Sequence, residues 1–101
     1  MPQYSPLELF LERIMGINIL RMGGASAGIF GSTGADNDVL HSLKKSSIAF
    51  AAEYKKPTAD QVKLEQLSNE IHGYIQTLQL LTTLSEKEAH KLIDQLQELT
   101  K

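Results

Sequence analysis

Apolar side chains recur along most of this chain with the spacing of amphipathic helices. The most regular stretch alternates steps of three and four residues, the a/d pattern of helices that pack along a seam. Its members are Leu64, Leu67, Ile71, Tyr74, Leu78 and Leu81. An N-terminal stretch is apolar around most of its circumference, which predicts a helix covered by several neighbours or by a second chain. We expect four helices, over residues 6–22, 38–54, 59–82 and 86–100.

Three capping motifs support the predicted helix starts. The pattern Ser/Thr-x-x-Glu/Gln begins at Ser5, Thr58 and Ser85. In this motif the hydroxyl accepts the N3 amide, and the N3 side chain reaches back to the amide of the cap residue. Only a few residues separate the last two predicted helices, which predicts an antiparallel αα-hairpin. The sequence therefore favours one all-α domain over residues 1–101, a four-helix bundle with a C-terminal αα-hairpin.

A glycine within the most regular helix adds a further expectation. Gly73 lies in the middle of the segment 59–82, where glycine costs ~1 kcal/mol relative to alanine. We take this as a sign that a neighbouring backbone approaches closely. The seam itself is expected to face the core of the same chain, although a seam of this kind can also pair two copies.

The segment 23–37 interrupts the helical pattern with five of the seven glycines in the chain. Connections within bundles are usually about 2–8 residues long, so a loop of this length is either functional or mobile. It also contains Ile29 and Phe30, which either tuck into the core or anchor a partner. The segment does not have the spacing of a P-loop or of a dinucleotide-binding loop. We therefore expect a long Gly-rich loop between the first two helices, with no cofactor.

Composition narrows the classes of function. The chain has no cysteine, which excludes disulfides, thiolate metal sites and a cysteine nucleophile, and favours the cytoplasm. It shows neither a secretory signal nor an apolar run long enough to span a membrane. No nucleophile with a base, paired carboxylates or cofactor motif is evident. We expect a protein that is not an enzyme and has neither a membrane partner nor a small-molecule substrate.

Two charged clusters are candidate sites. Glu86, His90 and Asp94 share one face of a predicted helix, but three ligands on one helix more often form a solvated charge ladder than a metal site. The Lys44–Lys63 band carries five lysines against two acids, which leaves a DNA-binding regulator as an alternative. A helix-turn-helix needs a polar second helix, and the apolar segment 59–82 does not fit. We expect no metal and no nucleic acid.

The surplus of apolar surface beside an overlong loop favours a protein that binds another protein, as a homodimer. In size and helix count the chain is similar to small bacterial accessory proteins, such as bacteriocin immunity proteins and plasmid-encoded inhibitors, although it shares no motif with them. An alternative is a subunit of a larger helical assembly. The expected contact residues are Ile29, Phe30, Leu9, Met15, Ile19 and Met22.

Overall fold

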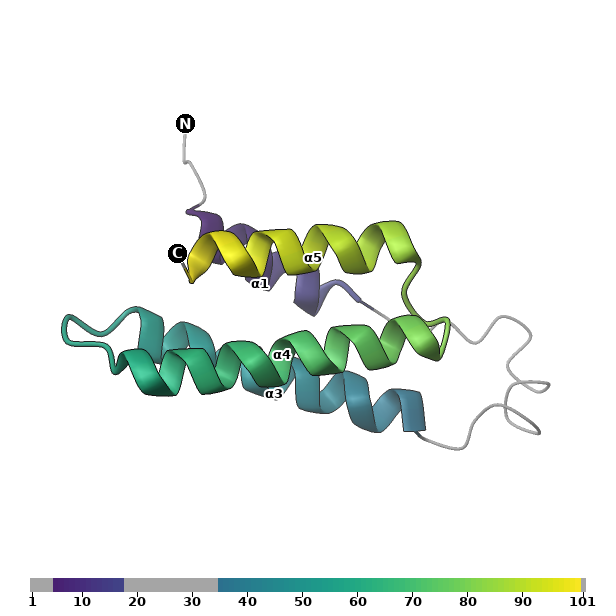
Figure 1. Ribbon diagram of the computed structural model, residues 1–101, viewed down its shortest axis with the longest axis horizontal. Coiled ribbons are helices and arrows are strands. Elements are labelled where there is room, and N and C mark those ends of the chain that lie inside the picture. Colours follow the sequence, from purple (N-terminus) through teal and green to yellow (C-terminus); the bar gives the residue numbers. More distant parts are fainter. Residues whose placement is uncertain (1–4, 18–34, 101) are drawn as a thin grey trace.

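The structure, a computed structural model, describes residues 5–17 and 35–100. These residues form four helices and no strand: α1 (Pro6–Met15), α3 (Ala35–Tyr54), α4 (Gln61–Leu80) and α5 (Glu86–Leu99). Successive helices run in opposite directions (Figure 1). Each helix packs against two neighbours, in the ring order α1, α3, α4, α5 and back to α1. The all-α four-helix bundle and its C-terminal αα-hairpin, α4–α5, are confirmed.

The core lies along the axis of this ring and takes apolar side chains from every helix. Its largest fully buried members are Phe10, Phe50, Ile14, Leu43, Ile71, Ile75, Leu78, Leu92 and Leu96. The predicted seam of α4 faces this core: Leu64, Ile71 and Leu78 are buried, and Leu67 and Tyr74 pack partly against them. Leu81 lies beyond the end of α4 and is exposed. The seam is therefore mainly internal to the chain, because burial of these side chains holds α4 against α3 and α5.

The first helix is shorter than predicted. α1 ends at Met15, and the expected helix over residues 6–22 does not continue through Gly16. The Gly16 amide still bonds to the Glu12 carbonyl (3.0 Å), but the Ile17 amide turns to the Ile14 carbonyl (3.1 Å). This tightening of the last turn is typical of a helix end, and glycine has little helix propensity. Residues 18–22 lie outside the described residues.

The second and third predicted helices also differ at their starts. α3 begins at Ala35, so the last three residues of the predicted loop 23–37 are helical, and residues 23–34 lie outside the described part of the chain. α4 begins at Gln61 because Asp60, and not Thr58, is its N-cap. The Asp60 carboxylate accepts the amides of the two residues that follow Gln61, at 3.0 and 3.2 Å. The expected capping box at Thr58 is therefore wrong.

Ser5 and Ser85 are both N-caps, as predicted, but only Ser5 forms the complete capping box. Ser5 and Glu8 form the complete reciprocal box at the start of α1. The hydroxyl of Ser85 accepts the Glu88 amide at 3.1 Å and begins α5, whose bounds differ from the prediction by one residue at its end. Both N-caps satisfy an amide that the helix itself leaves without a partner.

Candidate functional site

The predicted partner-binding residues fall partly within the described chain. Leu9 and Met15 lie on α1 and are 45% and 38% exposed. The other four, Ile19, Met22, Ile29 and Phe30, lie outside the described residues. At about 100° per residue, Leu9 and Met15 are about 120° apart around the helix, on the side away from its buried stripe. Within α1 they are therefore two separate apolar positions and not one continuous face.

A groove lies at the Met15 end of α1, where this helix meets the turn between α4 and α5. It has a volume of about 430 Å³. Its lining residues are Glu12, Arg13, Gly16, Ile17, Thr83, Leu84, Glu88 and Leu92. Leu84 and Leu92 are buried and form its apolar base, whereas Glu12, Arg13 and Glu88 are exposed. An apolar base with charged edges is the usual make-up of a protein contact surface.

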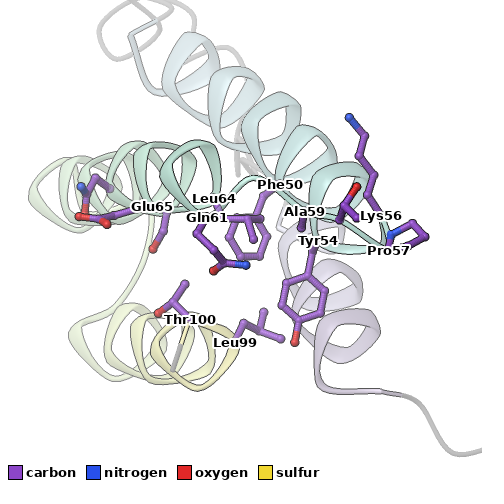
Figure 2. Close-up of a pocket in the computed structure, with 13 residues that line it drawn as sticks. Phe50, Tyr54, Lys56, Pro57, Ala59, Gln61, Leu64, Glu65, Leu99 and Thr100 are labelled. Atoms are coloured by element: carbon purple, nitrogen blue, oxygen red, sulfur yellow. The ribbon is translucent and has the colours of Figure 1, made fainter.

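A larger hollow, of about 750 Å³, lies at the opposite end of the bundle beside the turn between α3 and α4. Figure 2 shows the side chains of Phe50, Gln61 and Leu99 converging there from three helices. The rings of Phe50 and Tyr54 stack beside it with centroids 5.8 Å apart. The sequence does not reveal this hollow, because its walls come from segments far apart in the chain.

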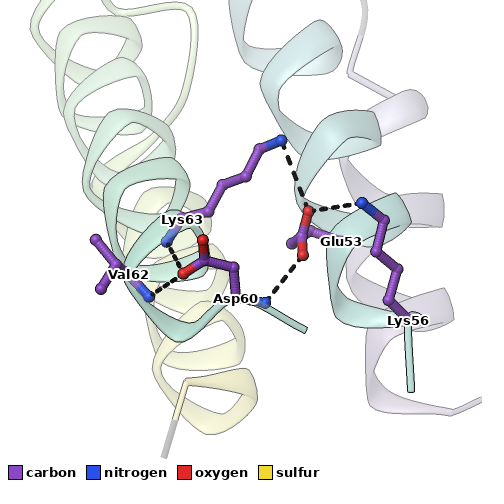
Figure 3. A network of polar contacts seen from close by, with 5 residues as sticks. All are labelled: Glu53, Lys56, Asp60, Val62 and Lys63. Carbon is purple, nitrogen blue, oxygen red and sulfur yellow. Dashed lines mark hydrogen bonds and ion pairs between the residues drawn. The ribbon is translucent and has the colours of Figure 1, made fainter. Parts of the chain in front are cut away.

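Next to this hollow, the carboxylate of Glu53 joins α3 to α4 (Figure 3). Glu53 is only 5% exposed. One of its oxygens accepts the Asp60 amide at 2.9 Å, and the other lies 3.1 Å from Lys56 Nζ and 3.6 Å from Lys63 Nζ. The Asp60 amide, and then Lys56 and Lys63, lower the pKa of Glu53 and outweigh burial, which acts to raise it. Glu53 is therefore held ionised as a link between the two helices.

This network changes how the lysines of the Lys44–Lys63 band are interpreted, because some of them already pair with a carboxylate of the same chain. Two of the five lysines, Lys56 and Lys63, neutralise Glu53 of the same chain. Charges that are already paired contribute less to the attraction of phosphates. In the sequence, Glu53 is only one of the two acids within this band. Its burial could not be predicted, because it depends on how the α3–α4 turn folds. The band is therefore partly an internal ion-pair network, which weakens the case for a DNA interface.

The acidic and histidine side chains of the described residues were expected to form no metal site. Within residues 5–17 and 35–100, no three His, Asp or Glu residues are placed to hold a metal ion. Glu86, His90 and Asp94 are exposed along α5. Among the helices that the structure describes, none combines the length and apolar character needed to cross a membrane.

Comparison of the chain with protein-family models, with curated proteins and with solved structures finds no match. What supports a function is therefore the surface chemistry of this chain: exposed apolar side chains on α1, a groove beside its end and a hollow at the other end of the bundle.

Proposed function

We propose that the chain is a non-catalytic cytoplasmic protein that binds another protein through the exposed apolar side chains of α1, and that it works as a homodimer. The observation that carries this proposal is the exposure of Leu9 and Met15 on a helix of ten residues. Leu9 lies about 100° and Met15 about 80° around the helix from the nearest buried residue, so a partner that contacts them would cover the outer side of α1. Apolar side chains of this kind serve as anchors when a partner excludes water from them.

The charged groups support a binding role. Glu53 is the one buried charged residue of the described chain, and its carboxylate is occupied by the Asp60 amide, Lys56 and Lys63. A carboxylate with a lowered pKa and filled hydrogen-bonding positions is a poor general acid or base. We therefore give Glu53 a structural role, and the proposed binding surface is on α1.

The test compares partner capture by the intact chain and by a double variant, Leu9→Asp with Met15→Asp. Both side chains are exposed, so the variant should keep its helical circular dichroism and lose the captured protein. Ile48→Asp is the control, because Ile48 is an exposed aliphatic residue on another helix, α3. The proposal fails if the double variant, folded as judged by its dichroism, retains the same proteins as the intact chain.

A subunit of a larger helical assembly is the second candidate. Exposed apolar side chains lie on more than one helix, with Ile48 on α3 and Leu80 on α4. Contacts between unlike surfaces of successive copies need not close, so such a subunit would grow with concentration beyond a dimer. Light scattering that shows a limiting mass of two chains would exclude this candidate.

A further inference from the structure

The outer face of α4 has a second line of residues with heptad spacing. Its members, which we call the outer seam, are Val62, Gln66, Asn69, Gly73, Gln76 and Leu80. They follow steps of 4-3-4-3-4, and none carries a charge. At about 100° per residue they lie on the side of α4 opposite its buried residues. Leu80 and Val62, at its two ends, are the most exposed large apolar side chains of the described residues, at 83% and 65%.

The glycine within the outer seam has no packing role among the described residues of its own chain. A Cβ built on Gly73 would meet no atom of the described residues within 4 Å, so these residues do not make the close backbone approach expected from the sequence. Glycine at this position nevertheless costs the helix ~1 kcal/mol relative to alanine. A backbone or side chain that approaches α4 from outside the chain would account for the missing side chain.

We propose that the outer seam pairs with the outer seam of a second copy, with the two α4 helices antiparallel. This interface belongs to the homodimer of the proposed function and rests on it. A two-fold axis near Ile71 places Val62 opposite Leu80 of the second copy, Gln66 opposite Gln76, and Asn69 opposite Gly73. Apolar side chains then meet at both ends of the contact, amides meet between them, and Gly73 makes room for Asn69.

Flanking charges select the antiparallel orientation. In a parallel pair, Glu65 of each copy would face Glu70 of the other, which gives two repulsive contacts. In the antiparallel pair Glu65 faces the uncharged Gln79 instead. The two Glu70 side chains then face each other across the two-fold axis, which leaves one repulsive contact in place of two.

The size of the contact sets the expected affinity. α4 has 20 residues and is about 30 Å long, and one helix from each copy makes a small interface. Amide pairs in its middle add specificity more than affinity. We expect a dimer that dissociates in the micromolar range, on the order of 10 µM.

Sedimentation velocity of the full chain and of single variants tests the surface. Leu80→Glu places a charge opposite Val62 twice in each dimer, and Gly73→Leu fills the space of Asn69, so each should weaken dimerisation at least about tenfold. Ile48→Glu is the control: Ile48 is exposed on α3 and lies about 200° around that helix from Ser46, which contacts α4. It should leave the dimer unchanged.

Cysteine cross-linking tests the orientation, because the chain contains no cysteine of its own. A mixture of Val62→Cys and Leu80→Cys chains should form a mixed disulfide dimer, and neither variant alone should cross-link efficiently. Homodimeric cross-links of each variant alone, or no cross-link in the mixture, would overturn the antiparallel pairing.

The outcomes separate this interface from the proposed function. A dimer that survives Leu80→Glu and Gly73→Leu but is lost in the Leu9→Asp, Met15→Asp variant would overturn the outer seam and leave the homodimer in place. An intact chain that stays monomeric up to several hundred micromolar would overturn both the seam and the homodimer, while partner capture through α1 would be judged by its own experiment.

Discussion

Among single residues, Glu53 joins two helices through three polar contacts of its carboxylate. Its carboxylate accepts the amide of Asp60, which in turn caps α4, and it lies beside two lysines from different segments. The contact thus fixes both the end of α3 and the first turn of α4. A buried carboxylate is tolerated when its oxygens are satisfied in this way.

Replacement of Glu53 by glutamine should lower the melting temperature. The amide keeps an acceptor for Asp60 but removes the charge that pairs with Lys56 and Lys63. Thermal unfolding at neutral pH measures the loss, with Glu65→Gln as the exposed control that should change little. Equal melting temperatures for the two variants would contradict the role given to Glu53.

The difference in stability between the intact chain and Glu53→Gln should depend on pH, and the lowered pKa of Glu53 sets the sign of this dependence. Because the folded chain lowers the pKa of Glu53 below its ordinary value of 4.5, the unfolded chain binds the proton more readily in that range. The stabilisation by Glu53 is then complete above the ordinary pKa of about 4.5. It is lost as the pH falls through the lower pKa that Glu53 has in the folded chain. The difference in melting temperature between the intact chain and Glu53→Gln should therefore be constant from pH 7 to about pH 5 and shrink below it.

Gly73 gives a prediction of the opposite sign. Since a methyl group there would meet no atom of the described residues within 4 Å, Gly73→Ala should stabilise the monomer by about 1 kcal/mol. Urea unfolding at a protein concentration well below the dimer's dissociation constant measures this free energy. A loss of stability would mean that Gly73 already has a close neighbour within its own chain.

At the scale of elements, α5 and the internal face of α4 follow from local pattern alone. Their apolar spacing matches burial, and the Ser85 motif begins α5 as expected. The start of α4 does not follow from local pattern, because Thr58 and Asp60 are both good cap residues. Asp60 is selected by Glu53, a residue of another helix that receives its amide. Local sequence cannot encode such a choice until the α3–α4 turn has formed.

The candidate site was less accessible from sequence for a similar reason. Because the α1 segment is apolar on most sides, its sequence does not show which side chains the other helices will cover. Leu9 and Met15 could therefore be predicted as contact residues, but their positions around the helix relative to the core could not. Half of the outer seam of α4 consists of polar amide side chains, so it gives no continuous apolar pattern. It becomes visible only when the buried face of the helix is known.

The turn after α4 provides a test at the element scale. The amides of Thr82 and Thr83 bond to the carbonyls of Gln79 and Leu78, at 3.0 and 2.9 Å, which is a Schellman motif. Thr82 occupies the left-handed position, with φ of 62°, where glycine is preferred and a β-branched residue is strained.

Thr82→Gly should therefore stabilise the chain by about 1 kcal/mol, because it removes this strain while the two backbone bonds remain. The midpoint of urea unfolding measures the change. Thr83→Gly is the control and should give no gain, since Thr83 does not have a positive φ. A destabilised Thr82→Gly variant would show that the threonine side chain contributes more than its conformation costs.

At the scale of the whole molecule, the bundle separates two kinds of surface. The core side of each helix is filled by side chains of the same chain, and the ring of four helices closes around it. The large apolar side chains that remain exposed among the described residues include Leu9 and Met15 on α1, Ile48 and Tyr54 on α3, and Val62 and Leu80 at the two ends of the outer seam of α4. We assign the exposed apolar side chains of α1 to the contact with a different protein, and the outer seam of α4 to the contact with another copy of the chain.

The most direct test of this account is the molar mass of the intact chain, measured by light scattering behind a size-exclusion column over a hundredfold range of concentration. The account predicts a mass that rises from one chain to a limit of two. A mass of one chain throughout the range, or growth beyond two chains without a limit, would contradict it.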